Sequence, residues 1–121
     1  MNEDIELMMK MYNTYEVDWM GDIITSLSSL TRHHIVKKEN GGINDISNYA
    51  LLTENSHHLL HFLEENYYED YISLNRLFLE LNRGLCPPDV KYYEKVRKIV
   101  KKVKKSIKNS RRIRNKKNKS L

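Results

Sequence analysis

Five histidines stand in two groups, His33-His34 and His57-His58-His61, and this spacing is the first pattern with a chemical meaning. On a helix, His57 and His61 lie one turn apart on the same face, which suits two ligands of a zinc ion. A third ligand would come from His33, Cys86 or a carboxylate. No Cys-x-x-Cys pair, Cys/His finger or zinc-protease pattern accompanies them. We therefore expect surface or half-buried histidines, with no metal and no cofactor.

Four carboxylates, Glu64, Glu65, Glu69 and Asp70, form a second cluster that resembles an acid/base or metal site. Glu65 and Glu69 are four residues apart and share a helix face. No apolar pocket surrounds them that would raise a carboxyl pKa, so we expect a solvated acidic face. A further interpretation is that this patch receives a basic tail, either from the same chain or from a neighbouring copy.

Cys86, the only cysteine, precedes Pro87-Pro88 and is a third candidate for chemistry. A nucleophilic thiolate needs a base or a helix N-terminus beside it, and the charge of Asp89 opposes one. We expect a structural cysteine in a reducing compartment. The chain has no phosphate-binding glycine loop, serine elbow or dinucleotide fingerprint. These observations predict no catalytic residue, no small-molecule substrate and no enzyme.

The strongest pattern is a division of charge along the chain. Between Lys91 and Leu121 there are fifteen Lys or Arg residues and one acid, Glu94, which gives a net charge of +14. Residues 1–90 hold six basic and fifteen acidic residues, so that their net charge is −9. An acidic body with a cationic extension indicates an electrostatic partner, most often nucleic acid or another anionic surface.

The cationic extension has several interpretations. An apolar stripe of Val and Ile can pack on the body while the lysines contact phosphate, or the helix can lie on anionic lipid or bind an acidic protein. The stripe lacks Trp, Phe and Leu, which argues against deep membrane insertion, and a merely solubilising tail is the plainest alternative. Counterion release supports phosphate binding. The residues expected to bind nucleic acid are Lys98, Lys101, Lys102, Lys104, Lys105, Lys108, Arg111, Arg112 and Arg114.

The same extension matches the pattern of a nuclear localisation signal. Lys104-Lys105 precedes Lys116-Lys117 by ten residues, the spacing of a bipartite import signal from Lys104 to Lys119. The N-terminus carries acids where a signal peptide needs positive charge, and no apolar run is long enough to span a bilayer. We therefore expect a soluble, intracellular protein, cytoplasmic or nuclear. The abundance of Asn, Lys, Ile and Tyr indicates an AT-rich genome, so a virion protein is also considered.

The sequence predicts that helices position the candidate residues described above. Asn2 is a suitable cap for a helix carrying Ile5, Met8, Met9 and Tyr12, and a second apolar stripe over residues 19–30 predicts another helix. At helical spacing, Trp19 and the tyrosines are expected in the core rather than stacked on bases. Asn40-Gly41-Gly42 marks a break, which we interpret as a loop although a β-ribbon is conceivable.

The second half of the chain also has helical periodicity. Ser56 is expected to cap a helical segment over residues 59–81, which a break in the acidic patch would divide in two, and Gly84 is expected to end it. Asp89 is expected to cap the basic helix. Apolar residues nearly vanish after Asn109, so residues 110–121 are expected to be disordered unless bound.

These expectations combine into an all-α fold, a small bundle of four or five helices with a basic C-terminal helix and a disordered tail. The predicted parts are an acidic helical domain (1–90), a basic amphipathic helix (91–109) and a disordered cationic tail (110–121). The predicted function is that of a non-enzymatic accessory protein: the basic segment binds DNA or RNA backbone without sequence specificity, and the body binds a protein partner or self-associates. The alternative is a structural or assembly protein, such as a virion or complex component, whose basic tail docks on acidic protein surfaces.

Overall fold

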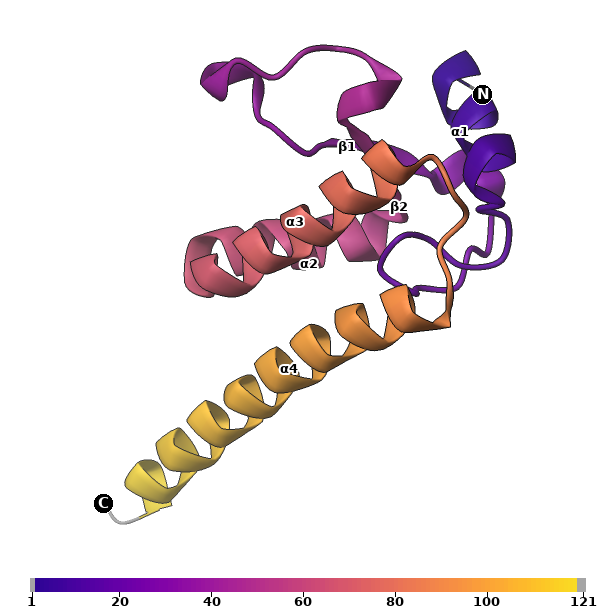
Figure 1. Cartoon of the computed structure of the whole chain (residues 1–121). Coiled ribbons are helices and arrows are strands. Elements are labelled where there is room, and N and C mark those ends of the chain that lie inside the picture. Colours follow the sequence, from indigo (N-terminus) through magenta and orange to yellow (C-terminus); the bar gives the residue numbers. More distant parts are fainter. Residues whose placement is uncertain (1, 120–121) are drawn as a thin grey trace.

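The computed structural model describes the backbone of residues 2–119 and the side chains of residues 2–111 except Ser28. A mostly helical body carries a small ribbon, and the long C-terminal helix runs along one side and projects past it (Figure 1). The α-helices are α1 (Glu3–Tyr12), α2 (Glu54–Asn66), α3 (Tyr68–Gly84) and α4 (Val90–Lys119). The strands are β1 (Thr31–His34) and β2 (Tyr49–Leu52), and three short 3-10 turns are η1 (Leu27–Ser29), η2 (Lys38–Asn40) and η3 (Ile46–Asn48).

The ribbon corrects the expected all-α class. β1 and β2 pair antiparallel, with Thr31 opposite Leu52 and His34 opposite Tyr49. All four residues of β2 are buried, and the strand packs against α1, α2 and α3. A strand buried on both faces lacks the polar and apolar alternation that marks a half-exposed strand in a sequence. The described fold is therefore mixed, with mostly helical content.

The helix expected over residues 19–30 is also absent, and the reason is a buried carboxylate. Asp18 Oδ1 accepts hydrogen bonds from the backbone N–H groups of Met20 (2.8 Å) and Asp22 (2.9 Å), and its Oδ2 accepts from the N–H of Thr53 (2.9 Å). These bonds replace the backbone pairing that a helix would supply. Gly21 follows with φ +83°, a left-handed conformation that glycine adopts without strain.

Trp19 lies at the centre of the core although it is in this irregular segment. Its side chain is fully buried, with the Tyr12 ring edge-on at 4.8 Å and the Phe78 ring at 6.4 Å. Its indole N–H donates to Thr14 Oγ1 over 3.3 Å. The expectation of a core tryptophan is confirmed, but a loop rather than a helix positions it.

The periodic segment over residues 59–81 does contain a break. Tyr67, with φ −140° and ψ 61°, separates α2 from α3. The cap of α2 is Thr53, whose Oγ1 accepts from the Ser56 N–H over 3.2 Å, so Ser56 is not the cap. At the other end, Leu85 rather than Gly84 takes the left-handed conformation, with φ 53°.

Helix α4 begins as expected and ends later than expected. The Asp89 carboxylate accepts a hydrogen bond from the Tyr92 N–H over 2.8 Å, which confirms the predicted cap. The helix packs along α3 and buries Val96 and Val103. In the described backbone it continues to Lys119, past the predicted end at Asn109. The disorder of the unbound tail over residues 110–121 stays a prediction. Lys and Arg are good helix formers, and no Gly or Pro follows Pro88.

Candidate nucleic-acid interface

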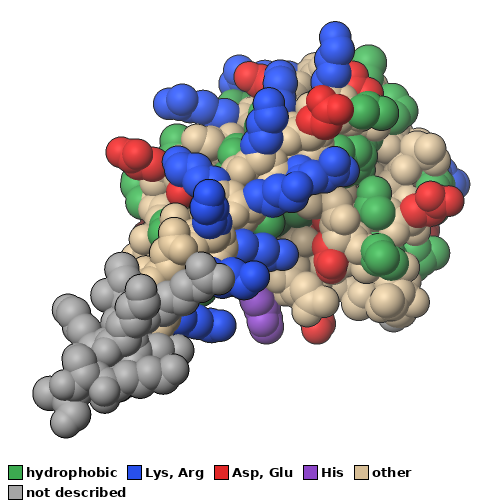
Figure 2. Space-filling view, turned by 90° about the horizontal axis from the view of Figure 1, so that it is seen from below, with side chains coloured by type: hydrophobic (Ala, Val, Ile, Leu, Met, Phe, Trp, Pro, Cys, Tyr) green, Lys and Arg blue, Asp and Glu red, His purple; other side chains and the backbone are tan. Residues whose placement is uncertain are grey.

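One face of α4 is apolar and docked, and the remaining faces carry cations. Tyr92, Val96 and Val103 are buried against the body. Because an α-helix has 3.6 residues per turn, the lysines between these positions are turned away from the core. Figure 2 shows the result as a band of Lys and Arg side chains over this face of the molecule, with apolar side chains beside it.

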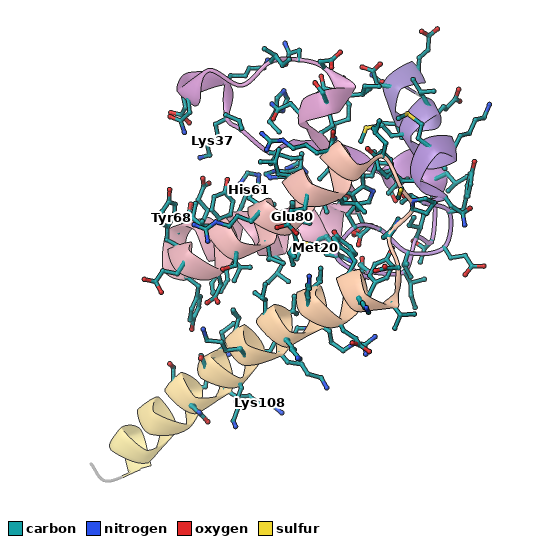
Figure 3. The ribbon with its side chains drawn as sticks, viewed as in Figure 1. Met20, Lys37, His61, Tyr68, Glu80 and Lys108 are labelled. Atoms are coloured by element: carbon teal, nitrogen blue, oxygen red, sulfur yellow. The ribbon has the colours of Figure 1, made fainter. Side chains whose placement is uncertain are left out.

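Five cations form a line that we call the cationic row. Its members are Arg97, Lys101, Lys104, Lys108 and Arg111. Their spacing of four, three, four and three residues places them on one flank of α4, and all five are exposed. The side chain of Lys108 points away from the body (Figure 3). Four of the five belong to the residues expected to bind nucleic acid. Sequence reasoning did not include Arg97 among these residues, although its position one helical turn before Lys101 indicates that the two share a flank.

The other candidate cations occupy different positions. Lys98 and Lys105 are exposed on the side of α4 opposite the docked stripe. Lys102 lies on the flank opposite the cationic row, where its Nζ is 3.5 Å from the Asp70 carboxylate of α3. The side chains of Arg112 and Arg114 lie outside the described residues.

A hollow lies between the row and the loop of residues 17–21. We call it the α4 groove; its volume is about 530 Å³. Apolar side chains of Val17, Met20 and Val100 form part of its lining. Three members of the cationic row also line it: Arg97, Lys101 and Lys104. The lining is completed on α4 by Val90, Tyr93 and Glu94. The sequence did not reveal this groove, because the loop reaches α4 only through the tertiary fold.

Tyr93 is held firmly at this groove. Its hydroxyl donates to the backbone carbonyl of Asp18 over 3.2 Å, and its ring lies edge-on to Tyr92 at 5.2 Å. Burial, followed by the nearby charge of Asp18, raises the pKa of Tyr93 to about 12. The phenol therefore remains a protonated hydrogen-bond donor at neutral pH.

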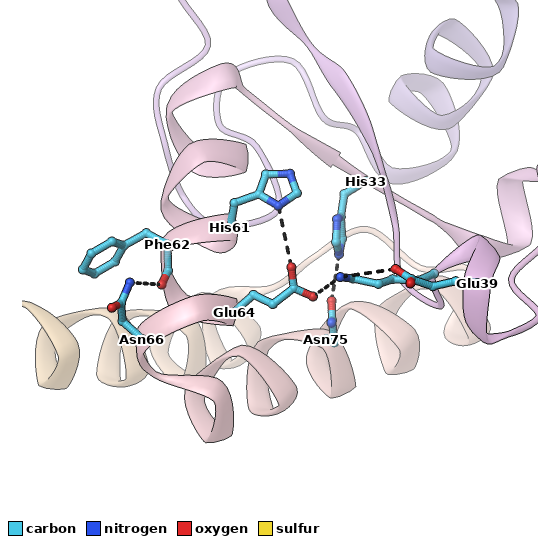
Figure 4. Close-up of polar contacts among 8 residues, drawn as sticks. His33, Glu39, His61, Phe62, Glu64, Asn66 and Asn75 are labelled. Atoms are coloured by element: carbon cyan, nitrogen blue, oxygen red, sulfur yellow. Dashed lines mark hydrogen bonds and ion pairs between the residues drawn. The ribbon is translucent and has the colours of Figure 1, made fainter.

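Three of the five histidines, His33, His57 and His61, lie side by side without forming a ligand set. His57 and His61 stack with ring centroids 4.9 Å apart, and the His33 ring lies edge-on to His57 at 5.6 Å. His33 Nε2 is 2.9 Å from Asn75 Oδ1, and His57 Nδ1 is 2.8 Å from Thr31 Oγ1 (Figure 4 shows the first pair). Within the described part of the chain, no group of three His, Cys, Asp or Glu side chains is arranged to hold a metal ion.

The buried position of His33 changes its protonation. Only 5% of its surface is exposed, and burial, partly offset by the hydrogen bond to Asn75, lowers its pKa to about 4. The pKa of His57 is also lowered, mainly by burial and then by the charge of His61. These rings are therefore neutral at pH 7, and they pack against the ribbon and the core.

The acidic cluster divides between two cations of the same chain. Glu64 forms an ion pair with Lys37, and its other oxygen is 3.9 Å from His61 Nδ1 (Figure 4). Asp70 pairs with Lys102 of α4. The acidic patch therefore does contact the chain's own basic segment, through the single pair of Asp70 and Lys102. Glu65 and Glu69 are exposed, as expected of a solvated face.

The remaining candidates are the cysteine and the aromatic residues. Cys86 is a free, exposed cysteine. The expectation that Trp19 and the tyrosines lie in the core is met in part: Trp19, Tyr12, Tyr49, Tyr71 and Tyr92 are buried. Tyr15 and Tyr68 are exposed, and Tyr49 lies in a strand rather than in a helix. No helix of the described chain has both the length and the apolar character needed to cross a lipid bilayer.

Comparison with known proteins gives no relative from which a role could be transferred. The chain matches no protein-family model, and it has no significant match to a curated protein or to a solved structure.

Proposed function

We propose that this chain is a non-enzymatic accessory protein whose helix α4 binds the phosphate backbone of DNA or RNA without reading sequence. The observation that carries the proposal is the cationic row, five exposed cations in line on one flank of a helix that is docked to the body through a different, apolar face. A phosphate backbone is the common biological polyanion that presents charges in a line. Neutralising it releases condensed counterions, which favours binding.

The row is free to meet such a partner. Among the described side chains, the one ion pair between α4 and the body joins Lys102 to Asp70, and Lys102 is still 74% exposed. An exposed pair of this kind contributes little and is screened by salt. Members of the row form none of the ion pairs found in the described region. The docked helix therefore retains its positive charge for an outside polyanion.

The body supplies the second part of the proposal, which is binding to a protein partner or to a second copy. Residues 1–90 carry a net charge of −9, so they repel nucleic acid and leave that role to α4. Large apolar side chains remain exposed on the body, among them Leu7, Ile23 and Ile43. Exposed apolar side chains of this kind can contribute to a protein interface.

The import hypothesis is kept as part of this proposal, with one structural condition. Lys104-Lys105 lies within α4, and Lys116-Lys117 lies within its last turns. A receptor that reads an extended chain would therefore need the end of α4 to unwind. With this signal the protein would act in the nucleus, and without it in the cytoplasm.

The decisive experiment compares two variants that lose the same charge. One replaces Lys101, Lys104, Lys108 and Arg111 by Gln, and the control replaces the exposed body residues Lys10, Lys38, Arg76 and Arg83 by Gln. Fluorescence anisotropy with a labelled oligonucleotide measures Kd over a series of salt concentrations. We expect the first variant to bind at least tenfold more weakly with a shallower salt dependence, and the control to resemble wild type.

The assembly alternative predicts a different outcome of the same work. Nuclease-treated protein would then form oligomers that dissolve as salt rises, and light scattering would detect them. If neither variant binds oligonucleotide differently from wild type, or wild type does not bind at all, the proposed function is wrong.

A further inference from the structure

The geometry points to single-stranded nucleic acid as the ligand, with an unpaired base in the α4 groove and the adjoining phosphates on Arg97, Lys101 and Lys104. This inference rests on the proposed function, because it assumes that α4 binds a phosphate backbone. It adds the substrate class and one site for a base. The contacts that support it are the composition of the groove, the fixed aromatic ring of Tyr93 and the position of the cations.

The groove combines two kinds of surface in one place. Val17, Met20 and Val100 provide an apolar lining, and the three cations of the row lie on the α4 side. The volume of about 530 Å³ is within the range of pockets that hold small organic ligands. A nucleotide in a single strand has the matching form, a flat and largely apolar base joined to an anionic backbone.

Tyr93 supplies a stacking surface that needs no rearrangement. The hydrogen bond to the Asp18 carbonyl and the contact with Tyr92 fix the ring. Gly21 lies beside the edge of this ring, where a Cβ atom would be 3.7 Å from Tyr93 Cδ1, and both residues line the groove. Stacking on an aromatic ring beside a positively charged groove is how single strands are bound without sequence preference.

Glu94 and the geometry of a duplex both favour a single strand over a duplex as the ligand. The Glu94 carboxylate lines the groove and can accept a hydrogen bond from the exocyclic amino group of a base. In a duplex, however, the bases are paired and stacked, and placing one in a groove requires its extrusion at a cost in free energy. A single strand avoids this cost. The groove should therefore favour single strands over duplexes of equal charge.

The test uses the full chain and three fluorescein-labelled probes, each about twelve nucleotides long. The first is a mixed-sequence single strand, the second has abasic residues at its central positions with every phosphate retained, and the third is the duplex. Anisotropy titrations at one salt concentration give the three Kd values. We expect the intact strand to bind at least about fivefold more tightly than the abasic strand, as the loss of one stacked base implies.

Variants of one aromatic residue locate the effect. Tyr93→Leu keeps every charge but removes the ring, so the preference for the intact strand should disappear while the abasic strand binds as before. Tyr93→Phe retains the ring and should retain the preference. Tyr68→Leu, at an aromatic side chain that is 60% exposed and outside the groove, is the matched control and should also retain it.

The outcomes separate this inference from the proposed function. Equal Kd values for the intact and abasic strands would overturn the base site but leave phosphate binding in place. Absence of salt-dependent binding to every probe would overturn both. An acidic peptide containing phenylalanine that displaces the intact strand at lower concentration than unlabelled strand would assign the groove to a protein ligand and overturn the inference. If Tyr93→Leu fails to fold, the wild-type comparison of the probes still decides.

Discussion

The Tyr92 hydroxyl, in the first turns of α4, donates a hydrogen bond to the backbone carbonyl of Trp19 in the core. Tyr92 and Trp19 are both buried, and burial is the main reason that the pKa of Tyr92 is raised well above its usual value. This contact ties the basic helix to the acidic body at the edge of the candidate interface. The cationic row is therefore carried on a helix whose first turns belong to the core.

The first prediction concerns this bond. Tyr92→Phe leaves the Trp19 carbonyl without its partner in a buried site, which should lower the free energy of unfolding by about 1–3 kcal/mol. Urea denaturation measures the change. Tyr93→Phe removes a longer bond (3.2 Å) from a half-buried hydroxyl and should cost less. Equal losses for the two variants would contradict the assignment of Tyr92 as the main anchor.

The second prediction concerns the carboxylate that shapes the loop of the groove. Asp18→Asn replaces one acceptor oxygen by an amide nitrogen in a site where both oxygens accept hydrogen bonds, from the N–H groups of Met20, Asp22 and Thr53. We expect a loss of about 2–3 kcal/mol in the free energy of unfolding. Asp45→Asn is the control, because Asp45 is an exposed cap of a 3-10 turn and its loss should cost about 1 kcal/mol or less. A stable Asp18→Asn protein would show that the loop is held by other contacts.

The third prediction is a pH dependence of stability. The folded-state pKa of His33 is about 4, below its ordinary value of 6.5, so the unfolded chain takes up the proton first as pH falls. Stability from this group is fully present above pH 6.5 and is lost between there and about pH 4. The loss should reach about 2–3 kcal/mol near pH 4.5.

Chemical denaturation at several pH values tests this on variants. His33→Gln retains a donor for Asn75 but does not titrate, so its stability should fall less steeply with pH than that of wild type. His58→Gln changes an exposed histidine and should follow the wild-type curve. Parallel curves for wild type and His33→Gln would remove His33 as the cause.

The fourth prediction compares two glycines. A Cβ atom on Gly42 would lie 1.8 Å from the Val36 carbonyl oxygen, so Gly42→Ala must displace the turn that follows β1. We expect a loss of about 1–3 kcal/mol. A Cβ atom on Gly84 would meet nothing within 4 Å in the last turn of α3, and Gly84→Ala should stabilise by about 0.5–1 kcal/mol. Thermal melts of both variants measure the contrast, and a shift of the same sign in both would refute it.

The fifth prediction uses two neighbouring lysines. Lys101 belongs to the cationic row, whereas Lys102 is turned toward Asp70 on the opposite flank. Lys101→Gln should reduce the salt dependence of oligonucleotide binding by about one released ion, and Lys102→Gln should have a smaller effect. Plots of log Kd against log salt give both slopes. The same change in slope for both lysines would mean that binding does not follow the row.

The parts of the fold that sequence reasoning predicted depend on local contacts. Asn2 and Asp89 cap their helices through residues two and three positions away, and such bonds can be inferred from residue type and spacing. The docked stripe of α4 follows from helical periodicity in the same way. Four of the five members of the cationic row were among the residues expected to bind nucleic acid, because they lie on this single, regular helix, but their alignment on one flank was not predicted.

The parts that were wrong depend on contacts far apart in the sequence. The stripe from Trp19 to Leu30 has helical spacing, but the Asp18 carboxylate reaches Thr53 and holds the segment as a loop. The strand Tyr49–Leu52 has no alternation, because all four of its residues are buried and three helices pack against it. The α4 groove requires that same loop beside α4, so residue spacing alone could not have revealed it.

Trp19 also gives the molecule an intrinsic optical reporter. It is the only tryptophan in the chain, and its side chain is fully buried. Its backbone carbonyl accepts a hydrogen bond from Tyr92 in the first turn of α4. Separation of the basic helix from the body would wet this ring and shift its emission to longer wavelength, without any attached dye. If α4 stays docked when the ligand binds, the emission maximum will not change. One emission spectrum therefore distinguishes a helix that remains docked from one that dissociates from the body.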